Sequence, residues 1–520
     1  MYARSAAQLR ILINSLTLHC TGLWPGLTYQ RKMGEKSEAE DMNIATVCAT
    51  INTGLEQLGN QECVEKLGSR SLSRTVKKFR GRIIFELPAQ DIEKATQLRS
   101  VDNLSVVLNH ISDVDLHQEK EQVIDDLCKK IIESNWKLAL DTWRNFTKSE
   151  LCLDPLPGKL PSASSKYLDA KTAPEVGIKD KNDDSRGEVP PKESSLSEVP
   201  LADTPSEAVS SGGVPQGEST SSANRPTFRV TCTRTGEKHK FNSRDIAPAV
   251  GSLINETFGW PVKMKDYDIE VVVNIQEDST MVSISLTKES MHRRNITHFG
   301  ITTLKSTIAY CMLRMAQPQP GEVIIDPMCG VGGIPLEGLL DWKSCHVVAG
   351  DMNDVAVERT KANLDSLSER RRSNRIERPD IENDVLQWDV TNLPLKSASV
   401  DVFVTDLPFG KRLGSRRNNW SLYHKCLEEM ARVCRPGTGR AVLLTQDKKC
   451  MVQTLQRCHH IWRKKHVYFI NHGGLKACIY LLQRPNVKQR RNKTDGQDGA
   501  VDVDEGMDES TEQDDEMQSS

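Results

Sequence analysis

No Cys-x-x-Cys pair occurs among the 14 cysteines of this 520-residue chain. The spacing therefore argues against a zinc ribbon or a disulfide framework, no metal site is predicted, and reduced thiols of a cytosolic or nuclear protein are expected. The chain also lacks an apolar run of about 18 residues, which argues against a membrane span. Hydrophobic residues make up only 37% of the chain, so part of it is not expected to join a core. The net charge of -2 excludes a simple polycation, and any basic surface must be local.

Acidic residues are missing from residues 1–34, which contain several arginines. That composition is typical of a mitochondrial presequence. Residues 11–18 lack a clean basic face, however, which favours an extended or alternative start over an import signal. We predict a flexible segment over residues 1–42 and a cytoplasmic protein, with the nucleus as a second compartment.

Aromatic residues are almost missing from residues 154–226, where Tyr167 is the only one. Ser, Pro, Gly, Glu and Lys dominate this stretch, which cannot bury enough apolar surface to offset its chain entropy. We predict a disordered insertion. Residues 488–520 contain many acidic residues and no aromatic residue, and they are predicted to form a disordered, solvated tail.

Two small α+β units flank the insertion. The first, at residues 43–150, is predicted to be ferredoxin-like, with strands at 45–52, 81–87 and 104–108, helices at 55–67 and 91–98, and helical apolar spacing over 123–131. The second, at residues 227–290, has a β-α-β-β pattern, with strands at 228–233, 268–275 and 281–286 and a helix that Ser243 could cap.

The sequence pattern of residues 291–485 predicts a Rossmann-like α/β domain. After an apolar helix at 304–315, five short strands alternate with helices, and a hairpin around Gly473 and Gly474 closes the segment. Apolar strands that alternate with helices are typical of a parallel, doubly wound sheet covered on both faces. We expect a seven-stranded, mostly parallel sheet.

The first strand of this domain ends at Asp326 and runs into a glycine-rich turn (DPMCGVGG) that contains Gly330 and Gly332. Glycines at such a turn let a ligand approach the backbone closely. Ligands of open α/β sheets bind at the carboxyl ends of the strands. The turn alone is compatible with NAD, FAD, another nucleotide or no ligand.

Acidic residues at the ends of the next two strands narrow the choice among these possible ligands. Asp351 ends the second strand, where it could accept hydrogen bonds from both ribose hydroxyls, and Asp389 ends the third, where it could accept one from an adenine amine. Acids at three consecutive strand ends are the layout of class I S-adenosylmethionine methyltransferases. The alternative is that Asp326 and Asp389 only cap the turns that follow. Cys329 is predicted to be a small packing residue rather than a nucleophile.

The fourth strand ends in the motif TDLPFG at residues 405–410. An exocyclic base amine is a poor nucleophile because its lone pair is delocalised into the ring. Asp406 and a backbone carbonyl could accept its two N–H bonds and direct the lone pair at a sulfonium methyl. Pro408 stiffens the loop, and Phe409 offers a face on which an extruded base could stack. The alternative is an aspartate that caps a turn before proline.

This motif resembles the (Asp/Asn)-Pro-Pro-(Tyr/Phe) signature of amino-group methyltransferases. Leu407 occupies the second position, which leaves the backbone acceptor in place. The last position is a Phe without a hydroxyl, so stacking must replace any hydrogen bond that a Tyr would make.

Together with the stretches RVTCTRTGEKH and SMHRRNITHFG, these motifs make the chain similar to the THUMP-domain tRNA guanine-N2 methyltransferases. The resemblance covers residues 43–150 and 227–485 and joins two unrelated modules in the expected order. It implies a ferredoxin-like domain, a THUMP domain that grips the 3′ end of tRNA, and a catalytic domain that methylates an acceptor-stem guanosine around nucleotide 6. It also implies a heterodimer with a small zinc-containing methyltransferase activator.

The resemblance assigns roles to individual residues. Asp406, Pro408 and Phe409 would form the catalytic motif. The residues that would bind S-adenosylmethionine are Asp326, Pro327, Cys329, Gly330, Gly332, Asp351 and Asp389. Clusters of basic residues are candidates for RNA binding because they can contact phosphate, namely Arg293 and Arg294 before the catalytic domain and Lys411, Arg412, Arg416 and Arg417 after the catalytic motif. Arg370, Arg371, Arg372 and Arg375 are expected in a loop before the third strand.

Other functions stay open at this point. The acceptor could be ribosomal RNA guanine, an adenine amine or a protein glutamine. A non-catalytic RNA-binding scaffold would be expected to have a damaged cofactor turn or no carboxylate at position 406, and neither is seen.

Overall fold

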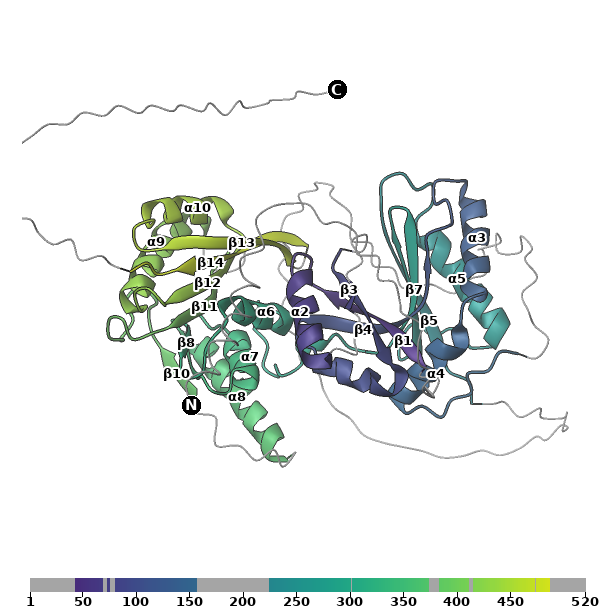
Figure 1. Ribbon diagram of the computed structural model, residues 1–520, viewed down its shortest axis with the longest axis horizontal. Helices are drawn as coiled ribbons and strands as arrows, with labels where there is room; N and C mark the ends of the chain where they lie inside the picture. Colours follow the sequence, from purple (N-terminus) through teal and green to yellow (C-terminus); the bar gives the residue numbers. More distant parts are fainter. Residues whose placement is uncertain are drawn as a thin grey trace, which may run out of the picture. The chain divides into compact units, whose positions relative to one another are not determined.

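The computed structural model describes residues 43–68, 73–74, 80–156, 224–300, 302–373, 383–410, 415–472 and 474–486. They form two seven-stranded sheets with their helices (Figure 1). The predicted segments 1–42 and 488–520, and nearly all of 154–226, lie outside the described residues. None of the described helices is long and apolar enough to cross a membrane.

The first sheet contains strands of both small units, in the order β2-β3-β1-β4-β7-β6-β5. Strand β4 pairs antiparallel with β7, so that Val106 lies opposite Ile284. The sequence suggested two separate units, but this pairing joins them into one sheet. The strands are β1 (Ile44–Ile51), β2 (Ser73–Arg74), β3 (Arg82–Pro88), β4 (Val101–Ile111), β5 (Phe228–Thr235), β6 (Ile269–Gln276) and β7 (Ser279–Ser285). The β-α-β-β-α-β order up to residue 111 is compatible with a ferredoxin-like fold, which stays a prediction.

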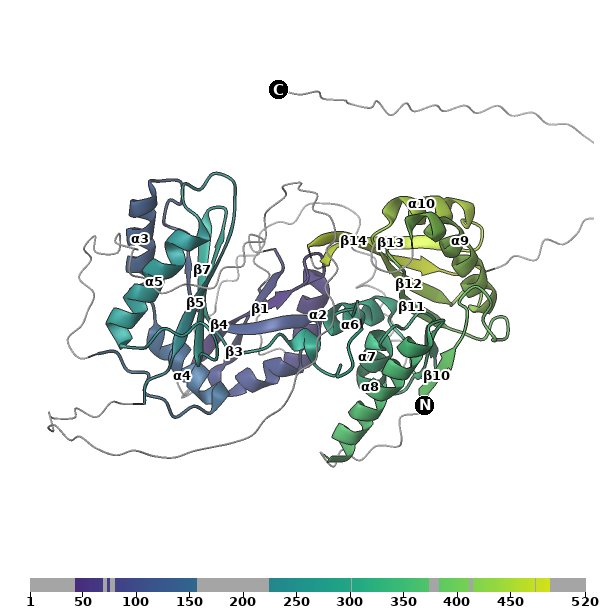
Figure 2. The same ribbon diagram turned by 180° about the vertical axis from the view of Figure 1, so that it is seen from behind.

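The helices of this sheet are α2 (Glu56–Leu67), the 3-10 helix η1 (Ala89–Gln97), α3 (Lys120–Ile132), α4 (Trp136–Thr147) and α5 (Ser243–Phe258). Helix α3 packs against α5, and Figures 1 and 2 show the two side by side. Helix α3, which belongs to the first small unit, therefore contacts helix α5 of the second small unit. Helix α5 begins one residue earlier than a Ser243 cap would require: its N-cap is Asn242, which forms a capping box with Asp245.

The second sheet has the order β10-β9-β8-β11-β12-β14-β13. Its strands are β8 (Val323–Asp326), β9 (His346–Asp351), β10 (Asn383–Gln387), β11 (Val402–Asp406), β12 (Arg440–Thr445), β13 (Arg463–His472) and β14 (Leu475–Gln483). Only β14 runs against its neighbours, which confirms the predicted mostly parallel sheet.

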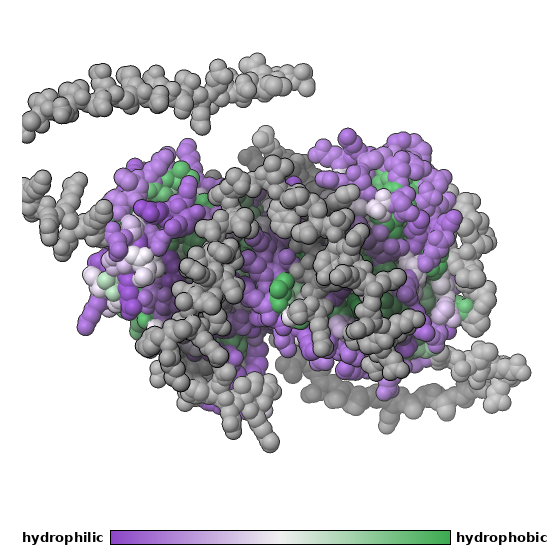
Figure 3. Space-filling view, viewed as in Figure 1, coloured by the Kyte–Doolittle hydropathy of each residue, from purple (hydrophilic) through white to green (hydrophobic). Residues whose placement is uncertain are grey.

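Around the second sheet and before it lie η4 (Met291–Arg293), α6 (Ser306–Ala316), α7 (Gly333–Asp341), α8 (Asp354–Ser373), α9 (Arg416–Val433) and α10 (Lys448–Arg457). The prediction of a loop at Arg370, Arg371 and Arg372 is wrong, because they form the last turn of α8. Basic side chains are favoured there by the helix dipole. Arg375 lies outside the described residues. The coloured residues on the face seen in Figure 3 are mainly hydrophilic, with smaller hydrophobic areas between them.

A shared apolar core joins the N-terminal unit to the catalytic domain. Ile51, Leu55 and Leu58 belong to the same buried cluster as Ile308 and Met312 of α6. Burial of such side chains contributes about 1.5–3 kcal/mol each. The N-terminal unit therefore completes the core of the catalytic domain.

Candidate active site

The predicted acidic residues meet at one edge of the second sheet. Asp326, Asp351 and Asp406 end the strands β8, β9 and β11, and β8 lies between the other two. Asp389 follows the end of the neighbouring strand β10 by two residues. Four adjacent strands therefore present carboxylates at the edge where ligands of open α/β sheets bind.

The glycine-rich turn between β8 and α7 has the backbone conformation that requires glycine. Gly330 and Gly332 have φ values of 56° and 84°, in the left-handed region that other residues rarely adopt. A Cβ on Gly330 would meet open space, whereas one on Gly332 would lie 2.9 Å from the Thr360 side chain. The backbone at Gly330 is thus accessible to a ligand. The Asp351 carboxylate accepts a hydrogen bond from the Gly330 N–H at 2.9 Å.

Three residues that sequence reasoning did not assign to the site hold this turn in place. Trp388 donates from Nε1 to the Pro327 carbonyl at 3.1 Å and packs so closely on Gly350 that a Cβ there would overlap it. Asn363 and Thr360 of α8 donate to the carbonyls of Val331 and Gly330. Buried polar side chains in the middle of α8 are the signal that was available in the sequence, because such groups need buried partners.

Cys329 is buried in the turn, and its predicted packing role stays a prediction. Its amide N–H donates to the Gly350 carbonyl at 2.8 Å, and burial raises the pKa of its thiol well above the usual range. A thiol in that state is a weak nucleophile.

Asp326 is almost completely buried. Burial raises its pKa to about 7, and the nearby negative charge of Asp351 acts in the same direction. Its Oδ1 accepts a hydrogen bond from the Met328 N–H at 3.2 Å. Asp389 is exposed, and its Oδ1 accepts from the N–H and hydroxyl of Thr391 at 2.8 Å. Both carboxylates thus cap turns, as the alternative reading proposed, while they also lie at the ligand edge.

One carboxylate oxygen of Asp406 receives no hydrogen bond from the described residues. The residue is partly buried, and its Oδ1 is enclosed without a hydrogen-bond partner among the described residues. Burial and the charge of Asp326 raise the pKa of this carboxyl well above its usual range. An enclosed acceptor without a partner is costly, and a ligand N–H would remove that cost.

Helix α9 holds the loop after Asp406 in place through hydrogen bonds. Pro408 accepts hydrogen bonds at its carbonyl from Asn419 Nδ2 at 3.1 Å and from the Tyr423 hydroxyl at 2.8 Å. The Leu407 side chain is buried in the core between the sheet and α9. Phe409 is partly buried against the core on the other face. The motif therefore keeps a defined shape before any substrate binds.

The basic residues predicted to bind RNA differ in their exposure and in their hydrogen bonds. Arg293 and Arg417 are exposed, and Arg416 begins α9. Arg294 donates to the carbonyls of Thr96 and Leu98 at 3.1 and 2.6 Å, which favours a structural role. Lys411 and Arg412 lie outside the described residues.

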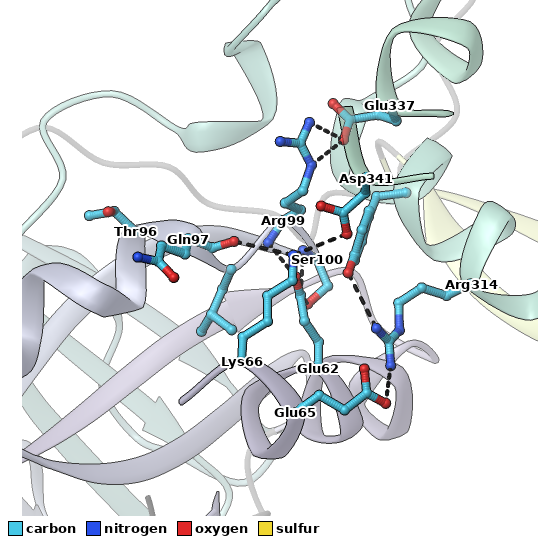
Figure 4. Close-up of polar contacts among 12 residues, drawn as sticks. Glu62, Glu65, Lys66, Thr96, Gln97, Arg99, Ser100, Arg314, Glu337 and Asp341 are labelled. Carbon is cyan, nitrogen blue, oxygen red and sulfur yellow. Dashed lines mark hydrogen bonds and ion pairs between the residues drawn. The ribbon is translucent and has the colours of Figure 1, made fainter. Parts of the chain in front are cut away.

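Helix α7, which begins in the glycine turn, is held by charged contacts with the N-terminal unit (Figure 4). Arg99 Nε lies 2.7 Å from Oε2 of buried Glu337, and Lys66 Nζ lies 3.2 Å from Asp341 Oδ2. Arg314 of α6 pairs with Glu65 of α2 at 2.7 Å. The N-terminal unit therefore positions the helix that carries the end of the cofactor turn.

Comparison with known proteins agrees with this architecture. A family model described as "RMKL-like, methyltransferase domain" matches residues 293–477, and a THUMP domain model matches residues 216–285. The chain is 42% identical over 476 residues to tRNA (guanine(6)-N(2))-methyltransferase THUMP3 of Mus musculus, which covers 87% of this chain and 90% of that protein. The chain belongs to the THUMP-domain guanine-N2 methyltransferase family.

A second protein and one solved structure match different shares of the chain. A mouse protein named U6 snRNA (guanine-N(2))-methyltransferase THUMPD2 is 32% identical over 222 residues, which is 42% of this chain and 39% of that protein. The crystal structure of TrmN from Thermus thermophilus aligns with a TM-score of 0.58 and 18% identity, covering 85% of this chain and 99% of that one. This structural likeness supports the fold.

Proposed function

We propose that this methyltransferase transfers a methyl group from S-adenosylmethionine to the exocyclic N2 of an acceptor-stem guanosine of tRNA, around nucleotide 6. The observation that carries the proposal is the enclosed Asp406 Oδ1, which has no hydrogen-bond partner among the described residues and lies at the strand end next to Asp326. The product is N2-methylguanosine. A THUMP3 relative that aligns over most of the chain supports this substrate.

The residues at the carboxyl edge suit S-adenosylmethionine. When bound, this cofactor supplies an electrophilic methyl group on a positively charged sulfur. Buried Asp326 offers negative charge toward such a cation, and the open backbone at Gly330 allows a close approach. In our proposal Asp351 binds the ribose hydroxyls, Asp389 binds the adenine amine, and Pro327, Cys329 and Gly332 shape the turn.

The catalytic motif would orient the guanine amine. Asp406 accepts one N–H bond and the Leu407 carbonyl accepts the other, since the Pro408 carbonyl is already used by Asn419 and Tyr423. With the amine held in this way, its lone pair would point at the methyl carbon of the bound cofactor, which would supply the methyl group and keep the electron pair of the carbon–sulfur bond. The N2 proton would pass to solvent water after transfer, so Asp406 would act mainly by orientation and electrostatics. Phe409 stacks on the guanine ring.

Exposed basic residues near these elements would hold the RNA backbone. Arg293 and Arg417 are exposed, and we include Lys411, Arg412 and Arg416 by their position after the catalytic motif. Alanine at Arg416 or Arg417 should weaken tRNA binding and spare cofactor binding. Unchanged tRNA affinity at several salt concentrations would contradict this assignment.

We also propose a small zinc-containing activator as partner, and the edge strand β10 as its docking surface. Strand β10 is the last strand of the sheet on its side, and no strand among the described residues pairs with its outer backbone groups, which could therefore pair with another chain. Leu386 on β10 and the nearby residues Met352 and Val355 are 42%, 72% and 44% exposed. We place the enzyme in the cytoplasm, where reduced thiols are expected.

A second candidate substrate is U6 snRNA, because the relative named for that RNA matches the chain. That match covers less than half of the chain, so tRNA is favoured. Incubation with labelled S-adenosylmethionine and either RNA, followed by nucleoside analysis, separates the two. N2-methylguanosine in tRNA supports the proposal, and its appearance only in U6 snRNA overturns the substrate assignment.

The matched test of the site is Asp406→Asn, which keeps the shape and removes the charge. We expect methyl transfer to fall at least about 100-fold, the scale of losing one oriented electrostatic contact, while S-adenosylmethionine affinity changes little. Asp113→Asn, the same change at an exposed aspartate that is paired with Lys130 outside the second sheet, is the control and should leave methyl transfer unchanged. Full activity of Asp406→Asn would show that this carboxylate is not catalytic.

A further inference from the structure

Phe469 is an aromatic residue that the proposed mechanism does not use. It lies on β13 and is 67% exposed. Strands β12 and β13 both run against β14, so they point the same way. Phe469 and Thr445 are both paired with Cys478 of β14, which places Phe469 at the carboxyl edge together with the catalytic carboxylates.

Contacts connect the Phe469 ring to the catalytic motif. Lys448 Nζ lies 5.1 Å from the ring centroid, within cation–π range. The preceding residue, Asp447, contacts Asn419 Nδ2 at 3.3 Å, and Asn419 donates to the Pro408 carbonyl. The ring therefore lies on the α9 and α10 face of the sheet, which is also the face of the Leu407 side chain, at the edge that carries Asp406.

The backbone that carries this ring is held on both sides. Strand β14 pairs along one side of β13. On the other, the Asn471 N–H donates to the Thr53 carbonyl at 3.2 Å, and Gly54 packs against the Phe469 carbonyl. A ring on a fixed backbone loses little further entropy when it stacks on a ligand.

The charges around the ring favour a nucleic acid over a protein ligand. Lys449 of α10 and Lys476 of β14 are exposed near Lys448 and Phe469. The acidic residue of this group, Asp447, already accepts bonds from Asn419 and from the Cys450 N–H. Aromatic faces flanked by cations bind unpaired bases by stacking while the cations contact phosphate.

We propose that Phe469 is a stacking platform for a nucleotide of the RNA substrate that lies near the guanosine in the site and is unpaired once the acceptor stem opens there. Lys448 orients the ring and contacts the phosphate of that nucleotide. This inference rests on the proposed function, since it assigns the nucleotide to the same RNA.

The test compares Phe469→Leu, which keeps an apolar side chain without a π face, with Phe469→Tyr, which keeps the ring. tRNA binding is measured at several salt concentrations, and kcat and KM are measured for tRNA and for S-adenosylmethionine. Phe469→Leu should weaken tRNA binding about 5- to 100-fold with an unchanged salt slope and unchanged KM for S-adenosylmethionine. Phe469→Tyr should bind like the wild type. Lys448→Ala should reduce the salt slope by about 1.

Val452→Ala is the matched control, because Val452 is an exposed apolar residue of the same helix as Lys448. It should bind tRNA like the wild type. If Phe469→Leu also binds like the wild type, or loses binding to a protein activator instead of RNA, the platform is overturned. Failure of the wild-type chain to methylate tRNA overturns the proposed function itself, so the two failures are distinguishable.

Discussion

Asp326 is a buried carboxyl group whose charged neighbour, Asp351, has the same sign. Burial first, and that neighbour second, raise its pKa to about 7. The proposed ligand carries a positive sulfur, which would stabilise the ionised form of this carboxyl. Ligand affinity should therefore depend on pH in a range where ordinary aspartates do not titrate.

We predict that S-adenosylmethionine binds about 10-fold more weakly at pH 6 than at pH 8, because most Asp326 is protonated below its pKa. Isothermal titration calorimetry at both pH values measures this difference. Asp326→Asn should bind weakly at both pH values. An affinity of the wild type that does not change between pH 6 and pH 8 would exclude this role.

The same carboxyl group should lower the stability of the free protein. Its pKa is raised on folding, from 3.8 to about 7, so ionisation costs folding free energy that grows as pH rises from about 4 to about 7 and is constant above. Asp326→Asn should then raise the melting temperature, and more so at pH 8 than at pH 5. Asp389→Asn, at an exposed position, serves as the control and should change little.

At the scale of elements, α7 depends on a partner from the other sheet. Glu337 of α7 is buried, burial raises the pKa of its carboxyl, and Arg99 opposes that shift. Arg99 follows η1, far from α7 in sequence. The pair therefore couples the helix at the end of the cofactor turn to the N-terminal unit.

We expect Arg99→Ala to destabilise the protein by up to about 3–5 kcal/mol, because it removes the cation that is hydrogen-bonded to a buried carboxylate and leaves only the charge of Arg294 nearby. Urea unfolding measures the loss. The double variant Arg99→Met with Glu337→Leu should recover much of it, since both charges are then gone. Equal stability of Arg99→Ala and the wild type would mean that Glu337 is not held by this pair.

The strands of the second sheet were predictable because their apolar runs end in recognisable turns, as at Asp326 and Asp351. The helices that support the turn were harder to assign, since Thr360 and Asn363 act only through tertiary hydrogen bonds. The pairing of β4 with β7 joins strands about 170 residues apart in sequence, and no local pattern encodes it. The predicted roles of the site residues themselves stay predictions.

At the scale of the whole molecule, the catalytic domain shares its core with the N-terminal unit. Ile51, Leu55 and Leu58 pack in the cluster that contains α6. Removing the N-terminal unit would expose this apolar surface and leave Glu337 without Arg99. The two functions of binding RNA and transferring methyl groups therefore depend on one folded core.

A chain shortened to residues 291–485 should melt at least about 5 °C below the full chain, because several buried apolar side chains lose their cover. Circular dichroism melting measures this shift. A chain shortened to residues 44–485 keeps the cover and is the control. Equal melting temperatures for 291–485 and 44–485 would show that the catalytic domain folds on its own.

The dependence of the catalytic domain on the N-terminal unit also involves one close contact, between Gly54 and strand β13. The φ of Gly54 is 96°, and a Cβ there would lie 2.0 Å from the carbonyl oxygen of Phe469. Any larger residue would push the β13 backbone away from Thr53 and tilt the Phe469 ring. A single added methyl group, more than 400 positions upstream in the chain, would thus change how the enzyme receives its nucleotide without touching a catalytic side chain.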